Sequence, residues 1–92
     1  MAQNTKILVP ANTATLLTDS AVTALTFTVE GQFPVQLQGR AGTGAITTWG
    51  PTYDSGQGEL NIAIADLFPG VSGVDRVYAL AFSPTVVWVS HA

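Results

Sequence analysis

The single histidine of the chain, His91, is the residue whose type could most readily support catalysis. A catalytic triad needs a nucleophile, a base and an orienting acid within hydrogen-bond reach of one another. The chain has no cysteine and no serine in a G-x-S-x-G sequence, and His91 lies one residue from the C-terminus, where chains tend to fray. The sequence therefore predicts no enzyme and no catalytic residue. We interpret His91 as the end of a strand, where it packs or hydrogen-bonds locally or lies at a subunit contact.

The acidic residues offer little for a metal ion. Asp54 and Glu59 flank a glycine-containing loop, and Asp66 and Asp75 stand on either side of two further glycines. Carboxylate oxygens bind Ca²⁺, but the acidic spacing of an EF-hand loop is missing here. The segment AGTG at residues 41–44 has no lysine and precedes no expected helix, unlike a phosphate-binding loop. We expect no metal site and no cofactor.

Two aromatic residues, Trp49 and Tyr53, flank one loop of the chain. Aromatic faces stack against sugars, so carbohydrate binding without catalysis is one interpretation. Packing in the core or at an interface is the other, and it is the one we favour because large aromatic side chains dominate interface energies.

The composition points to contact with other protein. Charged residues make up 10% of the 92 residues, three basic against six acidic, whereas an average soluble domain has about 25%. Charged groups are costly to desolvate, so a surface poor in charge suits an interface. A chain this short is only marginally stable alone, and without cysteine it has no disulfide to help. We therefore expect a homo-oligomer, with a weakly charged monomer as the alternative.

Two classes of partner do not fit the sequence. The net charge is −3 and the three basic residues, Lys6, Arg40 and Arg76, are scattered, whereas nucleic-acid binding needs clustered positive charge. The longest apolar run, residues 77–82, is far shorter than the ~20 residues that span a bilayer. The first residues, MAQNTKILVPAN, are not typical of a secretory signal. We expect no nucleic-acid partner and no membrane partner.

Strict alternation of apolar and polar residues predicts β-strands. The apolar residues of the three clearest runs are Leu25, Phe27 and Val29; Phe33, Val35 and Leu37; and Leu60, Ile62 and Ile64. Weaker runs cover residues 5–9, 13–18, 45–49, 76–82 and 85–90.

Turn-forming residues separate these runs at about ten-residue intervals, which is typical of a sandwich. The sequence predicts a single all-β domain over residues 1–92, a small antiparallel β-sandwich or jelly roll of about eight short strands. One helical turn is expected around residues 65–68, before Pro69-Gly70. The last two runs are interpreted as a terminal hairpin, residues 77–82 and 85–90, with Ser83-Pro84 in its turn.

Large apolar side chains supply the candidate contacts with partners. Residues 1–10 are interpreted as an N-terminal arm, because residues 7–9 could add to the sheet edge of a neighbour. Trp88 stands in a run that is apolar on both faces, so we expect one side of it to meet the core and the other a neighbouring subunit. The interface candidates are Ile7, Leu8, Val9, Trp49, Tyr53, Phe68, Trp88 and His91.

Four short segments carry a resemblance to a known kind of protein. They are GEL at 58–60, ADLFPG at 65–70, RVYA at 76–79 and VSHA at 89–92. In these segments the chain resembles the small all-β virion proteins encoded by tailed bacteriophages and gene transfer agents, of the capsid decoration or cement type. The resemblance covers roughly the C-terminal third to half and includes no motif of chemical specificity.

The resemblance implies a structural role on the outside of a virus particle. Such a protein binds the major capsid protein of the assembled head and stabilises the shell, as a homo-oligomer for which a trimer is favoured. It is made in the host cytoplasm and ends on the outer surface of the capsid. The alternative is a phage tail, collar or fibre component that binds a host surface glycan.

Overall fold

The computed structural model describes residues 3–18, 21–41, 44 and 46–91. Within them the chain is almost entirely β-structure, as its alternation of residues predicts. The elements are β1 (Gln3–Val9), β2 (Thr15–Leu16), β3 (Ala24–Val29), β4 (Val35–Arg40), β5 (Ile46–Tyr53), β6 (Gly58–Ala63), α1 (Ile64–Leu67), β7 (Arg76–Leu80) and β8 (Thr85–His91). The helical turn expected before Pro69-Gly70 is α1.

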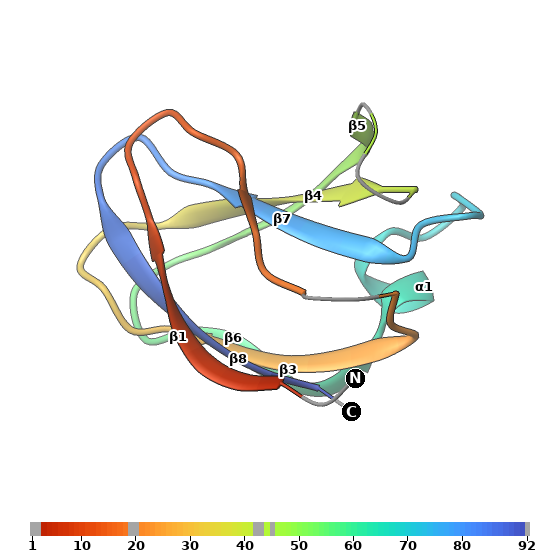
Figure 1. Cartoon of the computed structure of the whole chain (residues 1–92), viewed down its shortest axis with the longest axis horizontal. Coiled ribbons are helices and arrows are strands. Elements are labelled where there is room, and N and C mark those ends of the chain that lie inside the picture. Colours follow the sequence, from red (N-terminus) through yellow and green to blue (C-terminus); the bar gives the residue numbers. More distant parts are fainter. Residues whose placement is uncertain (1–2, 19–20, 42–43, 45, 92) are drawn as a thin grey trace.

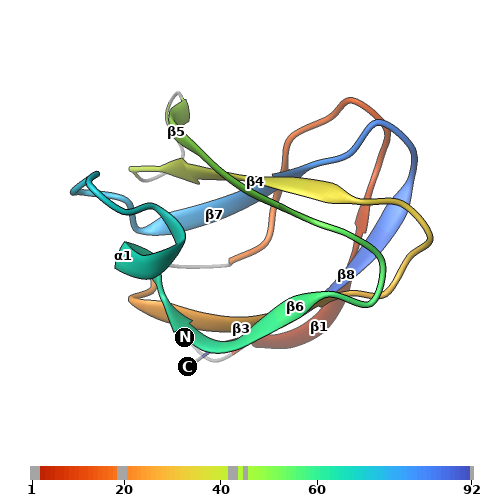
Figure 2. The same cartoon turned by 180° about the vertical axis from the view of Figure 1, so that it is seen from behind.

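The strands form two four-stranded antiparallel sheets that face each other (Figure 1). The first sheet has the order β1-β8-β3-β6 and the second β2-β7-β4-β5. Strand pairing is therefore nested: the first strand pairs with the last, the second with the last but one, and so inward to β4 and β5. This order is the jelly roll, one form of the predicted β-sandwich. Figure 2 shows the opposite side, where β5 and β6 lie at the front.

The last two strands do not form the hairpin that the sequence suggested. Strand β7 pairs with β2 and β4 in the second sheet, whereas β8 pairs with β1 and β3 in the first. The Ser83-Pro84 segment therefore carries the chain from one sheet to the other. A type I′ hairpin turn needs positive φ at both central residues, and Pro84, whose φ is fixed near −65°, cannot adopt it.

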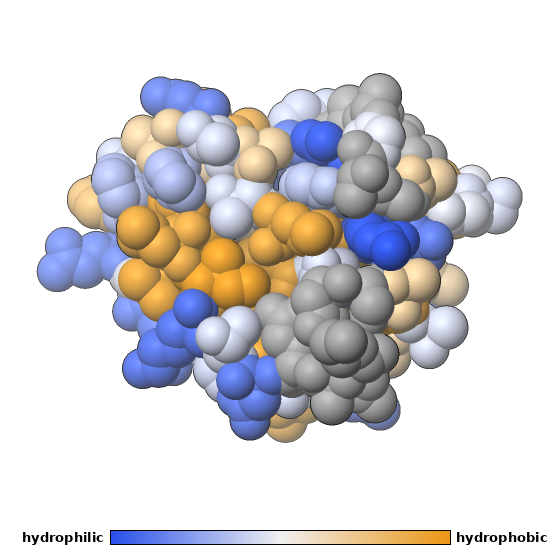
Figure 3. Space-filling model, viewed as in Figure 1, coloured by the Kyte–Doolittle hydropathy of each residue, from blue (hydrophilic) through white to orange (hydrophobic). Residues whose placement is uncertain are grey.

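The N-terminal residues are part of the domain in this structure. All seven residues of β1 pair with β8, from Gln3 opposite His91 to Val9 opposite Thr85. Residues 3–9 are thus an edge strand of the first sheet and not an extended arm, while residues 1 and 2 lie outside the described part. Figure 3 looks onto this side of the sandwich and shows apolar atoms gathered around β1 and β2.

The core lies between the sheets and is built by the alternation. Leu25, Phe27 and Val29 of β3 are buried as predicted, and they meet residues such as Leu37 and Val77 of the opposite sheet. Two predicted positions differ. Phe33 precedes β4 and is 43% exposed, and Leu60 is 84% exposed. The register between β3 and β6 shifts beside Leu60, which interrupts the alternation there.

Candidate functional site

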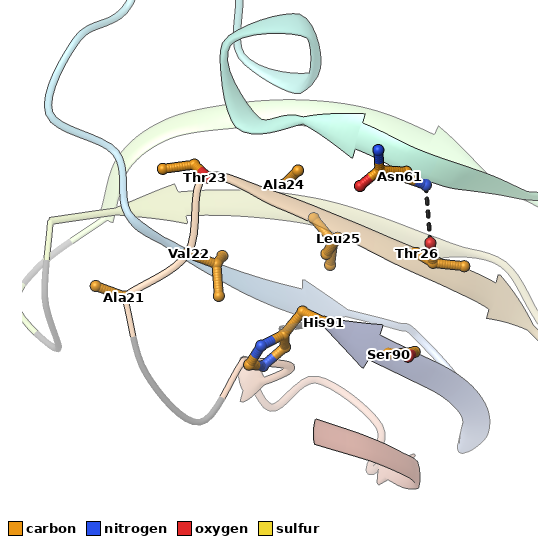
Figure 4. Close-up of a pocket in the computed structure, with 9 residues that line it drawn as sticks. All are labelled: Ala21, Val22, Thr23, Ala24, Leu25, Thr26, Asn61, Ser90 and His91. Atoms are coloured by element: carbon orange, nitrogen blue, oxygen red, sulfur yellow. Dashed lines mark hydrogen bonds between the residues drawn. The ribbon is translucent and has the colours of Figure 1, made fainter. Parts of the chain in front are cut away.

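A pocket of about 580 Å³ lies beside His91, at the end of β8 (Figure 4). Residues 21–26 line it together with Asn61, Ser90 and His91. The His91 ring is only 7% exposed, on the inner side of β8, and in Figure 4 it points toward the segment that holds Ala21 and Val22. Ser90 belongs to the outer face of the same strand, because neighbouring residues of a strand point to opposite faces.

The polar groups of this pocket are hydrogen-bonding groups set among apolar side chains such as Val22 and Leu25. The Thr26 hydroxyl accepts a hydrogen bond of 2.8 Å from the backbone N–H of Asn61. The lining contains one imidazole, hydroxyls and an amide, and none of its described residues is a carboxylate. No cluster of three or more His, Cys, Asp or Glu that could hold a metal occurs within the described residues. The arrangement suits a polar ligand held by hydrogen bonds, without an orienting acid from the described lining.

The loop between β5 and β6 uses its acidic residues locally. The hydroxyl of Tyr53 donates a 3.0 Å hydrogen bond to Glu59 Oε2, and the Asp54 carboxylate accepts one of 2.9 Å from the N–H of Ser55. Burial, together with the hydrogen bond and the negative charge of Glu59, raises the pKa of Tyr53 to about 12. Glu59, at the start of β6, therefore ties β6 to the end of β5, and Asp54 stabilises the turn between the two strands.

Trp49 and Tyr53 point to opposite faces of β5. Tyr53 stands opposite the buried Val35, and its ring meets the Phe27 ring edge-on, with 4.8 Å between the centroids. Trp49 stands opposite Gln38 on the outer face and is 52% exposed. The structure does not bring the two aromatic rings together, so they cannot clamp one sugar between them.

The outer face of the second sheet holds a polar and aromatic arrangement that sequence reasoning missed. The Arg40 guanidinium lies 4.0 Å from the centroid of the Tyr78 ring, and its Nη2 donates a 3.0 Å hydrogen bond to Gln38 Oε1. Gln38 and Tyr78 are cross-strand partners, and each is less than one-tenth exposed although it points outward. The sequence signal was the run Gln36, Gln38, Arg40, which alternates with apolar residues.

The same face becomes apolar toward the loop between β7 and β8. Phe82 is 83% exposed and lines a shallow depression with Pro34, Gln36, Thr52 and Leu80. Sequence reasoning missed Phe82 as well, because it was assigned to an arm of the expected terminal hairpin. We call the surface formed by Gln36, Gln38, Trp49, Thr52, Leu80 and Phe82 the Trp49–Phe82 face.

The remaining interface candidates fall into three groups. Leu8 is exposed and Ile7 is half-buried at the β1 edge. Trp88 lies half-buried on the outer face of the first sheet, where its indole N–H donates a 2.8 Å hydrogen bond to Asn4 Oδ1. Val9 and Phe68 do not fit the prediction that they contact a partner. Both are at most 2% exposed within the core of their own chain, so neither is available to a partner.

The chain matches no protein-family model, no curated protein and no solved structure. Within the described residues, no helix has the length and apolar character needed to cross a membrane.

Proposed function

We propose that the chain is a structural virion protein, a capsid decoration protein that binds an assembled phage head and stabilises the shell. The observation that carries this proposal is the exposure of two large aromatic side chains, Trp49 and Phe82, on one face of a small and weakly charged domain. They are 52% and 83% exposed. Buried aromatic anchors dominate the energy of protein interfaces, and these two are presented for burial by a partner.

The charges beside this face favour an acidic partner surface. Arg40 and Arg76 are cross-strand neighbours on the outer side of β4 and β7, and they are two of only three basic residues in a chain of net charge −3. Arg76 is paired with Asp75 at 3.2 Å, whereas Arg40 is held by Tyr78, Gln38 and the Gly44 carbonyl. A carboxylate of the capsid would supply the charge partner of Arg40.

The mechanism is physical and needs no reaction. A protein that binds the assembled shell but not its separated subunits stabilises the shell by mass action. Repetition of one contact at many equivalent sites of a symmetric particle multiplies the effect. Because most residues of this face belong to paired strands of one sheet, they lose less conformational entropy on binding than a disordered segment would.

The test is the variant Trp49→Ala, assayed for binding to virions of the source phage. Because the ring is half exposed on the outer face, we expect the melting temperature of the free protein to be nearly unchanged and particle binding to fall about thirtyfold, as for an interface hot spot. Leu60→Ala, at an exposed leucine of the other sheet, is the matched control and should bind normally. Normal binding of Trp49→Ala would contradict the proposal.

The copy number per particle separates this function from its alternative. A decoration protein is expected at a copy number comparable with that of the major capsid protein, measured by quantitative mass spectrometry of purified virions. A glycan-binding tail, collar or fibre component would be present in few copies. The observation that favours this second function is the exposed Trp49 opposite the amide of Gln38. Glycan-array binding that is lost in Trp49→Ala would support it.

A further inference from the structure

Three of the four sheet edges are blocked by features of their own backbone. Strand β2 has only two residues. Strand β5 contains Pro51, and its pairing with β4 has two register shifts. Strand β6 has a register shift against β3, and its Asn61 has a φ of 47°. Short strands, prolines and bulges are the means by which natural sheets prevent pairing with other chains.

The fourth edge, β1, has none of these features. Its seven residues pair with β8 in one uninterrupted register and include no proline. Strand β8 occupies one side of β1, and no described strand pairs with the other side, which therefore presents backbone N–H and C=O groups that the described residues leave unpaired. Such an edge is a template for a further strand.

The one charged residue of β1 is turned away from the free edge. Lysine at an edge normally opposes pairing. Here the Lys6 ammonium lies 3.2 Å from Glu30 Oε1, and Glu30 follows directly after β3, which is separated from β1 by β8. The lysine side chain therefore reaches across β8 toward the centre of its own sheet, leaving the edge itself unprotected.

The side chains along this edge are apolar at its C-terminal half. Ile7 is half-buried against the core and Leu8 is 63% exposed. Figure 3 shows apolar atoms around β1 on the side where the edge faces the viewer. An added strand would cover both residues.

We propose that the β1 edge binds the β1 edge of a second copy of this chain. Two identical antiparallel edges are self-complementary about a two-fold axis, so pairing joins the two four-stranded sheets into one continuous sheet. The proposal is independent of the phage role. It replaces the trimer implied by the resemblance with a dimer, because this contact closes at two copies.

The side-chain pattern selects the register of the pair. Opposite residues of antiparallel strands share a face, so the dimer can be centred on Thr5, Lys6 or Ile7. Centring on Lys6 places two lysines opposite each other, which is unfavourable. Centring on Thr5 leaves Leu8 outside the pairing. Centring on Ile7 places Leu8 opposite Lys6 of the other copy, sets no two like charges opposite each other and places Ile7 against Ile7, so this is the register we propose.

The first experiment measures the mass of the purified full chain by light scattering over a range of concentrations. We expect a reversible dimer of about twice the 9.6 kDa chain mass. In the proposed register, residue 8 of each copy stands opposite Lys6 of the other copy. Leu8→Lys therefore creates two lysine–lysine pairs and should weaken dimerisation about tenfold. Leu8→Glu creates two glutamate–lysine pairs at the same positions and should retain the dimer. Leu60→Lys and Leu60→Glu, at the exposed leucine of β6, are matched controls and should both leave the dimer unchanged.

A second experiment reads the register directly. The chain has no cysteine, so a single introduced cysteine reports only its own pairing. Ile7→Cys should cross-link to its copy under mild oxidation, since directly opposite residues lie within disulfide range, while Leu60→Cys should not. A monomer at every concentration, a trimer, equal weakening by both Leu8 variants, or cross-linking at Leu60 in preference to Ile7 would each overturn the proposal.

Discussion

Strands β1 and β6 are the two edges of one sheet, and each presents an exposed leucine. Leu60 of β6 is 84% exposed and Leu8 of β1 is 63% exposed, so exposure alone would choose β6 as the interface. The backbones differ in the opposite sense: β1 pairs regularly along its whole length, whereas β6 is interrupted by a register shift. The regularity of an edge, and not the exposure of one side chain, therefore indicates where another strand can add.

The two edges are also held to the domain in different ways. Strand β6 is fixed by side chains, through the bond from Asn61 N–H to Thr26 and the bond from Tyr53 to Glu59. Its Gly58 lies so close to β3 that an added Cβ would meet the backbone of Phe27 and Thr28. Strand β1 is held mainly by its ladder to β8, together with the hydrogen bond between Trp88 and Asn4 and the exposed ion pair between Lys6 and Glu30. Variants at Gly58, Tyr53 and Asn61 would change how β6 is held while leaving β1 untouched.

The largest effect is expected from Gly58→Ala. The new methyl group would clash with the backbone of β3 and push the β6 edge outward, so we expect the free energy of unfolding to fall by about 3 kcal/mol, as for an overpacked site. Urea denaturation measures it. Gly44→Ala is the control, because a Cβ there would meet its nearest atom at an ordinary 3.7 Å. Equal stability of the two variants would show that β6 is not held as close to β3 as described.

Tyr53→Phe removes the hydrogen bond that joins the end of β5 to Glu59 of β6. The ring and its edge-on contact with Phe27 remain, so the loss should be limited to about 1 kcal/mol, the value of one hydrogen bond. Thermal unfolding near neutral pH measures this loss. No loss would mean that the bond does not fix the β6 edge.

The same variant should alter the response to alkali. The folded protein keeps the Tyr53 proton up to a pKa of about 12, whereas tyrosine in an unfolded chain loses its proton near pH 10. Between these values the unfolded chain binds fewer protons, so the free energy of unfolding falls as the pH rises. Tyr53→Phe should show a smaller fall over this range than the parent protein, and an equal fall would contradict the assignment.

A smaller effect is expected at the bulge of β6. Asn61 has a φ of 47°, a left-handed conformation that asparagine and glycine accept more readily than other residues. Asn61→Ala should therefore lower the free energy of unfolding by roughly 0.5–1 kcal/mol, and Asn61→Gly should change it by less. Urea denaturation measures the free energy of unfolding of both variants. A larger loss in Asn61→Gly than in Asn61→Ala would contradict a strained backbone at Asn61.

Much of the fold followed from the sequence because alternation is a local signal. The runs around Leu25–Phe27–Val29 and Val35–Leu37 are buried as predicted, and α1 occupies the expected helical turn. Which strands pair is not local. Ser83-Pro84 connects two sheets because β7 and β8 pair with strands far away in the chain. Pro84 disfavours a tight hairpin there but does not determine which distant strands pair.

The candidate surfaces were predictable only in part. Trp49 and Leu8 were chosen from residue type and are exposed, while Val9 and Phe68 were chosen by the same reasoning and are buried, because residue type does not tell the inner from the outer face. The stacking of Arg40 on Tyr78 joins residues from β4 and β7 and depends on strand pairing. Leu60 was predicted to face the core and is exposed instead, because the bulge beside it reverses the alternation.

The most direct test of assembly through the β1 edge is hydrogen–deuterium exchange of the full chain at low and high protein concentration. Every second amide of a strand points away from its neighbour, so the outward amides of residues 3–9 exchange rapidly in the monomer and should become protected as the dimer forms. Exchange in β6, residues 58–63, should be the same at both concentrations. Protection that increases in β6 while β1 stays unprotected would contradict assembly through the β1 edge.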